Sequence, residues 1–318
     1  MECLLVNFGG PRDLNEVAPF LVSLLQDQDV IRTKLPPFAH RLLFGWIARR
    51  RALKVRRDYA LIGGKSPIYF DTEELAKKLN ISLTFHRYLP STHAESLEKI
   101  ERSKASTICV LPLFPQFCYA TTGSIARFFS ENLSPKTLNK LRWIKSYAAH
   151  PAFIRSYQKR IADYLQSQNL KEEESLLFFS AHGVPKIFIE EGDIYQSECE
   201  LSFKEVMKAF PKTKGLLAYQ SKFGRGEWLR PYTNELCEEI LSVHEGRKNI
   251  VFIPISFTSD HIETLFEIEE QYLPPVRAKN LNAFRCPSLN LEPYWIEALS
   301  EILQETNLCS AKMLIRFA

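Results

Sequence analysis

The chain has 318 residues, of which 45% are hydrophobic and 25% charged, and its formal net charge is +4. This length and hydrophobic fraction allow up to two domains with sizeable cores, and the small charge excess argues against nucleic acid as the main partner. The seven cysteines are scattered and form no C-x-x-C pair, which is typical of reduced thiols and excludes the common zinc and iron–sulfur motifs. The N-terminal apolar run is too short for a signal peptide, and no segment reaches the roughly twenty apolar residues of a membrane span. We therefore expect a soluble cytoplasmic protein, at most peripheral at the inner face of a membrane.

The first part of the chain, residues 1–148, alternates predicted strands and helices. The apolar patterns predict, in chain order, a strand at 4–8, a helix at 17–25, a helix at 72–79, a strand at 83–88, a helix at 94–102, a strand at 107–113, a helix at 124–129 and a strand at 141–147. The turn Gly9-Gly10-Pro11 lacks both the G-x-G-x-x-G pattern and a Walker lysine, so it is a weak indication of a nucleotide site. The alternation predicts one doubly wound α/β unit.

A basic and aromatic segment occupies residues 39–57 of this unit. It contains an apolar run followed by dense positive charge, namely Leu42, Leu43, Phe44, Trp46 and Ile47, then Arg49, Arg50, Arg51, Lys54, Arg56 and Arg57. The pattern suits an interfacial segment or the lip of a pocket for an apolar ligand with carboxylates, and it suits an ordinary surface helix equally well. The loop that follows contains Gly63 and Gly64, which let the backbone approach a ligand closely.

The second part, residues 149–292, repeats the alternation. Helices are predicted at 153–166, 197–210 and 234–243, and strands at 176–179, 215–220 and 250–253. A last helix, 293–306, is expected to pack back on the first unit. We therefore expect two Rossmann-like units with a cleft that faces the carboxyl ends of their strands.

An acidic helix is predicted directly after the strand 250–253. Glu263, Glu267 and Glu270 fall at i, i+4 and i+7 and would share one face of an α-helix, with His261 just ahead of them. Asp260 and Glu263 have the spacing of a reciprocal cap. A solvated acidic face explains this pattern as well, but the helix starts beyond the carboxyl end of a buried strand, where open α/β sheets place their ligands.

His182 lies at the end of another predicted strand, 176–179, and so at the same edge of the sheet. A single histidine at a strand end is commonly structural. Here a second histidine and aligned carboxylates converge on that edge, and neutral imidazole is both a metal ligand and a base near pH 7. The combination predicts a site for proton transfer or for a divalent metal.

Six segments carry a resemblance to a known family: LLVNFGGP, YALIGGKSPI, FPQFCYATTGS, FFSAHGVP, YQSKFG and FTSDHIETLFEIE. In this order and spacing they resemble ferrochelatase, a lyase that inserts ferrous iron into a porphyrin in the last step of haem synthesis. The resemblance covers nearly the whole chain. It implies two Rossmann-like units with four-stranded parallel sheets flanked by helices, a class II chelatase-like fold.

The resemblance also implies roles for individual residues. His182 and Glu263 would be the catalytic pair and the residues that contact the metal, although whether they bind iron or only accept protons stays open. Their supports on a path for protons or metal would be His261, Glu267 and Asp260, and the acidic row adds Glu270. The porphyrin would be contacted by Phe8, Arg51, Tyr59, Ser66 and Tyr119.

No permanent cofactor is expected, since Fe²⁺ would be a substrate. Some members hold a [2Fe–2S] cluster on cysteines, but the matching position in the FPQ loop is Tyr119, with Cys118 beside it, and the chain ends at Ala318. We therefore predict no cluster. The extension that supports the dimer in those members is also missing, so a monomer is expected rather than a dimer.

Other functions stay open at this stage. The expected porphyrin is protoporphyrin IX, and coproporphyrin III is the alternative. A non-enzymatic tetrapyrrole or haem carrier would need the pocket but not the acidic row. A cobalt chelatase of corrin or sirohaem synthesis would be shorter and richer in histidines than this chain, whose seven histidines are mostly isolated.

Overall fold

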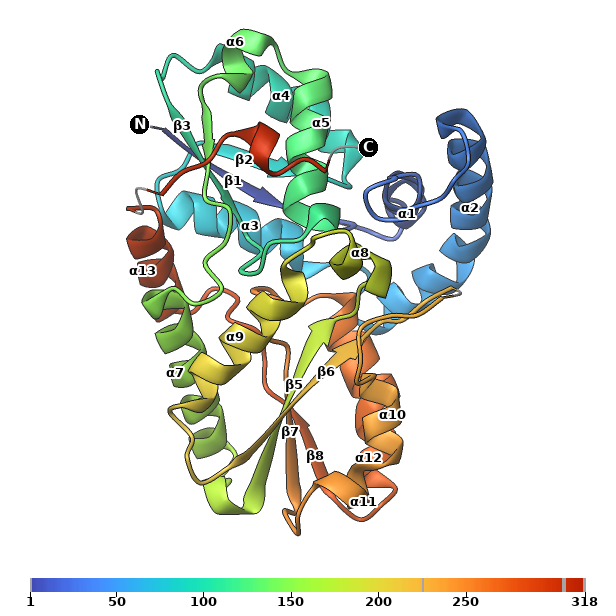
Figure 1. Cartoon of the computed structure of the whole chain (residues 1–318), viewed down its shortest axis with the longest axis vertical. Helices are drawn as coiled ribbons and strands as arrows, with labels where there is room; N and C mark the ends of the chain where they lie inside the picture. The colour runs from blue at the N-terminus through green and yellow to red at the C-terminus, as the bar shows by residue number, and fades with distance from the viewer. Residues whose placement is uncertain (1, 225, 305–306, 317–318) are drawn as a thin grey trace. The chain divides into compact units, whose positions relative to one another are not determined.

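A computed structural model describes residues 2–224, 226–304 and 307–316. The chain divides into two compact units, Met1–Ser146 with Ser300–Ala318 and Tyr147–Leu299. Over the described residues each unit contains a four-stranded parallel sheet, with strand orders β2-β1-β3-β4 and β6-β5-β7-β8 (Figure 1). The predicted fold class, two doubly wound α/β units, is confirmed.

The first unit is built from the strands β1 (Glu2–Asn7), β2 (Leu83–His86), β3 (Ile108–Pro112) and β4 (Leu141–Trp143), the helices α1 (Val17–Leu25), α2 (Pro37–Leu61), α3 (Pro67–Lys78), α4 (His93–Arg102), α5 (Ser124–Asn132) and α6 (Pro135–Leu138), and the short turns η1 (Pro90–Thr92), η2 (Tyr119–Gly123) and η5 (Ala311–Met313). Helices cover both faces of its sheet. Phe85 of β2 packs against Phe129 of α5, with ring centroids 4.7 Å apart, whereas the next residue, His86, packs against Tyr69 of α3. Successive side chains of a strand point to opposite faces, so α3 and α5 lie on opposite sides of the sheet.

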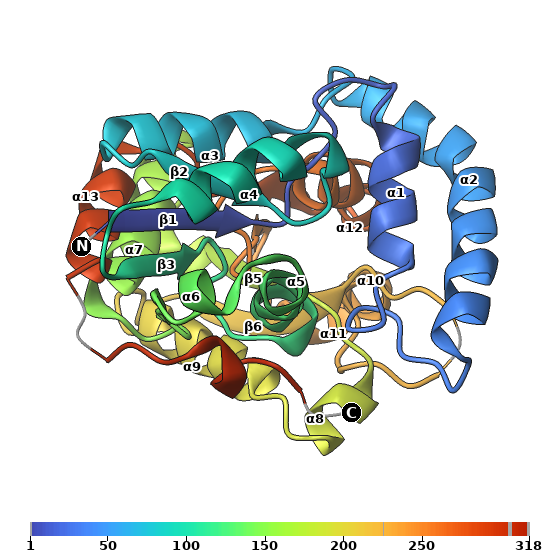
Figure 2. The same cartoon turned by 90° about the horizontal axis from the view of Figure 1, so that it is seen from above.

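Helix α2 packs closely on α1 and exposes its other side to solvent (Figure 2). The middle of its buried side is made of small residues, Gly45, Ala48 and Ala52. A Cβ atom on Gly45 would lie 2.6 Å from Nε2 of Gln26, so a larger residue there would require the Gln26 side chain to move. The packing fixes α2 along its length while Leu42 and Trp46 stay 72% and 53% exposed.

The second unit is built from the strands β5 (Ser175–His182), β6 (Lys214–Gln220), β7 (Asn249–Ile253) and β8 (Asn282–Arg285), the helices α7 (Pro151–Ser167), α8 (Lys186–Glu190), α9 (Tyr195–Met207), α10 (Thr233–Glu238), α11 (Ile240–Val243) and α12 (Leu273–Arg277), the 3₁₀ turn η3 (Glu172–Glu174) and the π-helix η4 (Glu263–Tyr272). Helix α13 (Pro293–Ile302) begins in this unit and ends in the first. Residues 305 and 306 of the predicted helix 293–306 lie outside the described residues.

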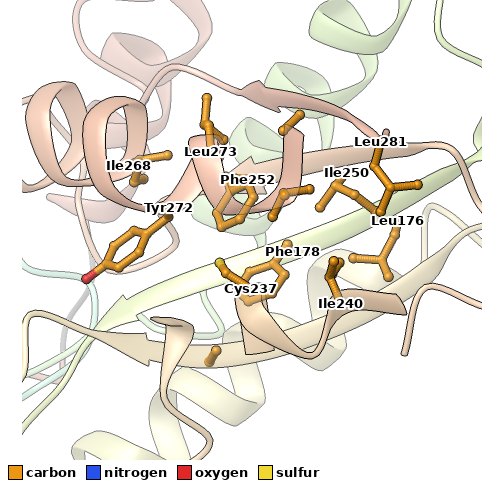
Figure 3. Packing of buried hydrophobic residues seen from close by; sticks show 13 residues of the cluster. Leu176, Phe178, Cys237, Ile240, Ile250, Phe252, Ile268, Tyr272, Leu273 and Leu281 are labelled. Atoms are coloured by element: carbon orange, nitrogen blue, oxygen red, sulfur yellow. The ribbon is translucent and has the colours of Figure 1, made fainter. Parts of the chain in front are cut away.

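The core of the second unit lies between its sheet and the helices α10, η4 and α12 (Figure 3). Phe178 of β5 and Phe252 of β7 stack with ring centroids 4.5 Å apart. On the opposite face of the sheet, Phe179 packs against Phe203 of α9. Burial on both faces explains the continuous apolar sequence of these strands.

Three local features differ from the sequence-based expectations. Strand β8 was not predicted, because only Ala283 of its four residues is buried and the others are exposed or partly exposed. The helix predicted at 234–243 is two short helices, α10 and α11, separated by Glu239. The segment after β7 is a π-helix rather than an α-helix. Within the described residues, no helix is both long and apolar enough to cross a membrane.

Candidate active site

The candidate site lies at the carboxyl ends of β5 and β7 in the second unit. His182 is the last residue of β5, and its Nε2 atom lies 3.5 Å from Oε1 of Glu263, the first residue of η4. Their side chains are 31% and 23% exposed. Because β5 and β7 are neighbours in the sheet, the fold brings a strand-end histidine and a helix-start glutamate together.

The surroundings of His182 favour its charged form in the protein without substrate. Its Nδ1 atom lies 2.5 Å from the carbonyl oxygen of Gly183, and its Nε2 faces Glu263, so both ring nitrogens face hydrogen-bond acceptors. Burial by itself would lower the pKa of His182, but the charge and hydrogen bond of Glu263 and the charge of Glu267 raise it to about 9. His182 is therefore an imidazolium near pH 7.

Glu263 lies between two imidazoles. Its Oε2 atom is 3.0 Å from Nε2 of His261, and its Oε1 atom faces His182. Burial alone would raise the pKa of Glu263, yet the charges and hydrogen bonds of the two histidines hold it well below its usual range. The three side chains form a contiguous row along which a proton can move.

Glu267 extends this row one step further. Its Oε2 atom accepts hydrogen bonds from Oγ of Ser221 at 2.5 Å and from Nε2 of Gln220 at 3.2 Å. Burial, and then the negative charge of Glu263, raise the pKa of Glu267 to about 7. Ser221 has a positive φ of 64°, a conformation that a non-glycine residue rarely adopts, and this turn directs its hydroxyl at Glu267.

The acidic helix differs from its predicted geometry in two ways. A π-helix holds more residues per turn than an α-helix, so the i, i+4, i+7 rule for a shared face does not apply. The prediction that Glu270 shares a face with Glu263 and Glu267 was therefore wrong in its geometry, and Glu270 is exposed. The reciprocal cap of Asp260 and Glu263 was also wrong, because the hydroxyl of Thr264 donates to Asp260 instead, at 2.8 Å.

Asp260 instead holds the loop before the helix. It accepts hydrogen bonds from Arg285, Ser288 and Asn290, and its own backbone N–H donates to Asn290. Burial works against the charge of Asp260, but Arg285 and these donors lower its pKa. Asp260 therefore supports His261 and Glu263 through the backbone rather than by direct contact.

The metal-binding capacity of this site is limited in the protein alone. Across the described part of the chain, no three His, Cys, Asp or Glu side chains are grouped as they would be to hold a metal ion. His182 and Glu263, the predicted metal contacts, would supply two ligands at most. An incomplete ligand set is compatible with a metal that passes through the site and completes its coordination elsewhere.

The predicted porphyrin contacts belong to the first unit. Phe8 follows β1, and its ring lies 4.5 Å from that of Tyr88. Tyr119 begins the π-helix η2 and packs edge-on against Phe117, with centroids 5.1 Å apart. Both Phe8 and Tyr119 are partly exposed.

The remaining three predicted contacts differ in exposure. Arg51 is exposed on α2, and a guanidinium is suited to pair with a carboxylate. Tyr59 and Ser66 are only 2% and 1% exposed. Exposure thus separates Phe8, Arg51 and Tyr119, which a ligand can reach at the surface of their unit, from the buried Tyr59 and Ser66.

Sequence reasoning missed four residues that touch this site: Gln220, Ser221, Ser256 and Tyr195. Gln220 and Ser221 lie in the segment YQSKFG, whose resemblance to the family was a usable signal. Ser256 stands in the polar turn after β7 and was interpreted only as a helix cap. Tyr195 had no signal, since it lies 13 positions after His182 and outside the quoted segments.

The raised pKa of Glu267 leads to a prediction about stability. The folded protein holds the Glu267 proton more tightly than the unfolded chain does, so this group stabilises the fold at pH 4.5 and loses that contribution as the pH rises through 7. Glu267→Gln should therefore raise the free energy of unfolding at pH 8 by roughly 1–2 kcal/mol relative to wild type, with little effect at pH 4.5. Thermal unfolding at both pH values measures this. Equal or lower stability of the variant at pH 8 would contradict the assignment.

Comparisons with known proteins show the family of the chain. The family model described as Ferrochelatase matches residues 3–307. Proteins named ferrochelatase from Chlamydia felis (strain Fe/C-56) and Chlamydia caviae (strain ATCC VR-813 / DSM 19441 / 03DC25 / GPIC) are 42% and 43% identical to the chain, in each case over 98% of both sequences. A ferrochelatase from Chlamydia trachomatis serovar A (strain ATCC VR-571B / DSM 19440 / HAR-13) is 42% identical over 96% of this chain and 97% of its own.

Two solved structures share the fold at low sequence identity. CbiX, described as the terminal enzyme for biosynthesis of siroheme in denitrifying bacteria, has a TM-score of 0.52 and 12% identity, covering 96% of this chain and 98% of its own. SirB from Bacillus subtilis with Fe³⁺ has a TM-score of 0.53 and 13% identity, covering 96% of both chains. At these identities the likeness concerns the fold alone.

Proposed function

The chain belongs to the ferrochelatase family of metal chelatases, which are lyases, and from this premise we propose that it inserts Fe²⁺ into protoporphyrin IX to give protohaem. The observation that carries the proposal is the row of His182, Glu263 and Glu267 at the strand ends of the second unit. Insertion of iron releases two pyrrole protons and requires a dication to lose its waters. A base next to carboxylates that share protons suits both steps.

In this proposal His182 accepts the pyrrole protons through Nε2. Its Nδ1–H donates to Gly183, which leaves Nε2 as the atom that gains and loses a proton. With a pKa of about 9 in the free protein, roughly 1% of His182 is neutral at pH 7, so His182 must first pass its proton on. Glu263 stays ionised beside it, because its pKa is held well below the usual range, so the nearby carboxylate that can take up this proton is Glu267.

Glu267 would then exchange that proton with solvent. Its pKa of about 7 means that it is half protonated near neutral pH and can both accept and release a proton. The same carboxylates can hold a cation before it enters the ring. Phe8 and Tyr119 would lie against the macrocycle, and Arg51 would pair with a propionate.

An anaerobic ferrous-insertion assay with protoporphyrin IX and coproporphyrin III tests this function. We expect turnover with both rings to be measurable and faster with protoporphyrin IX, because the exposed Leu42 and Trp46 favour the more apolar porphyrin. Faster turnover of coproporphyrin III would reverse the substrate assignment. Tight porphyrin binding without turnover of either ring would favour the carrier function and end the proposal.

We further propose that the protein acts in the cytoplasm and contacts a membrane surface through residues 39–57. Helix α2 exposes Leu42 and Trp46 beside Arg49 and Arg50, and Arg50 lies over the Trp46 ring at 4.2 Å from its centroid. An apolar and cationic face of this kind lies in the interface of anionic lipids, where each basic residue contributes about 1 kcal/mol.

Co-sedimentation with phosphatidylglycerol vesicles checks this contact. Binding should weaken with salt, and Leu42→Asp should reduce it at least about fivefold, since a buried leucine side chain contributes about 1.5–3 kcal/mol. Leu241→Asp is the matched control, because Leu241 is 56% exposed in the second unit. An equal loss in both variants would exclude α2 as the contact.

Two further assignments complete the proposal. We propose that the chain carries no [2Fe–2S] cluster, because Tyr119 stands where a cluster cysteine would be and the neighbouring Cys118 is buried. We also propose that it acts as a monomer. Iron analysis of the purified protein and sedimentation at several concentrations test these two points.

A further inference from the structure

On the side of β7 the backbone of His182 is held by side chains rather than by a strand, whereas on the other side β5 stays paired with β6 through His182 and Gln220. Strand β5 pairs with β7 only as far as Phe179 and Ile253, three residues before His182. The backbone N–H of His182 donates to Oγ of Ser256 at 3.0 Å, and its carbonyl oxygen accepts from Oη of Tyr195, also at 3.0 Å. Two hydroxyls therefore take over where the hydrogen bonds to β7 end.

The backbone that carries each of these two hydroxyls is held by further hydrogen bonds. Tyr195 is the first residue of α9 and is 6% exposed, and its backbone N–H donates to Oδ1 of the buried Asp193 at 3.0 Å. Ser256 lies in the loop between Pro254 and Phe257, whose carbonyl oxygens both accept from Oη of Tyr157 at 2.8 Å. These contacts hold the backbone from which each hydroxyl projects.

We propose that Tyr195 and Ser256 are positioning residues for the imidazole of His182, which hold its Nε2 atom at the place from which it accepts pyrrole protons. This inference rests on the proposed function. Proton transfer requires donor and acceptor within about 2.6–3.2 Å, and a displacement of 1 Å can cost about 100-fold in rate. Loss of one backbone contact should therefore affect the chemical step more than the binding of either substrate.

Tyr195→Phe is the sharpest test, because it removes one oxygen atom and keeps the ring. In the ferrous-insertion assay we expect kcat to fall by about five- to thirtyfold, with KM for porphyrin and iron within about twofold of wild type. Ser256→Ala should behave in the same way. The double variant should lose less than the product of the two single losses, since both act through His182.

One variant controls for general damage to α9. Ser202→Ala removes a buried hydroxyl on the same helix that donates to the carbonyl oxygen of Ala148 at 2.6 Å, and it does not touch His182. It should lower the unfolding temperature as much as Tyr195→Phe does, with kcat within about twofold of wild type.

The outcomes separate this inference from the proposed function. Wild-type kcat in Tyr195→Phe, or an equal loss of kcat in Ser202→Ala, would overturn the positioning role. A change confined to KM would overturn it as well. A wild-type protein that inserts no iron into either porphyrin would instead overturn the proposed function.

Discussion

His182→Ala should lower kcat for ferrous insertion by about 10²–10⁴, because a positioned general base typically contributes that much. In the structure no other imidazole takes its place, since Nε2 of His261 is already directed at Glu263. Porphyrin binding should persist, because Phe8 and Tyr119, the proposed contacts of the ring, are unchanged. Ferrous-insertion assays with protoporphyrin IX measure kcat, and a fluorescence titration with the same porphyrin measures its binding.

A matched control makes this result specific to the site. His244 lies in the same unit, and its Nδ1 atom contacts only the carbonyl oxygen of Arg247 among the described residues. His244→Ala should keep kcat within about twofold of wild type. If His182→Ala retained wild-type turnover, the imidazole would have no part in proton removal.

Glu263→Gln should also lower kcat by about 10²–10⁴, and in addition should change the pH dependence. The carboxylate of Glu263 holds the proton on His182, so its loss removes the largest influence that raises the pKa of His182 and moves that pKa down from about 9. In wild type, kcat/KM should therefore rise with pH up to about 9. In the variant the rise should end at a lower pH than in wild type, since kcat/KM reports the pKa values of groups in the free enzyme.

Glu270→Gln is the control for this second prediction. Glu270 lies on the same π-helix but is exposed, and its loss should leave both kcat and the pH profile within about twofold of wild type. A large loss of kcat in Glu270→Gln would instead support the expectation from α-helical spacing, in which Glu270 acts together with Glu263 and Glu267. An unchanged pH profile in Glu263→Gln would show that this carboxylate does not set the protonation of His182.

The architecture was predictable because it follows from apolar runs that alternate with helical patterns. The strands around Leu5, Val110, Phe178 and Val251 are buried on both faces, and their sequences are continuously apolar. Strand β8 carries no such signal, because it closes the edge of the sheet and has only one buried residue. The meeting of His182 and Glu263 was also predictable, since both follow neighbouring parallel strands.

The finer geometry of the site depends on contacts that no local pattern encodes. The π-helix places Glu267 against Ser221 and leaves Glu270 in solvent, and the spacing Glu-x-x-x-Glu-x-x-Glu is equally compatible with an α-helix. Ser221 contributes through a positive φ that its identity does not predict. Tyr195 reaches His182 only because α9 begins at that residue.

A crystal structure of the chain with metal-free protoporphyrin IX tests the account most directly. The account predicts a ring centre that faces the second unit's strand ends, with Nε2 of His182 within about 3 Å of a pyrrole nitrogen and the Glu263 carboxylate directly behind it. A porphyrin bound with its nitrogens turned away from His182, or at a surface that neither residue lines, would contradict it.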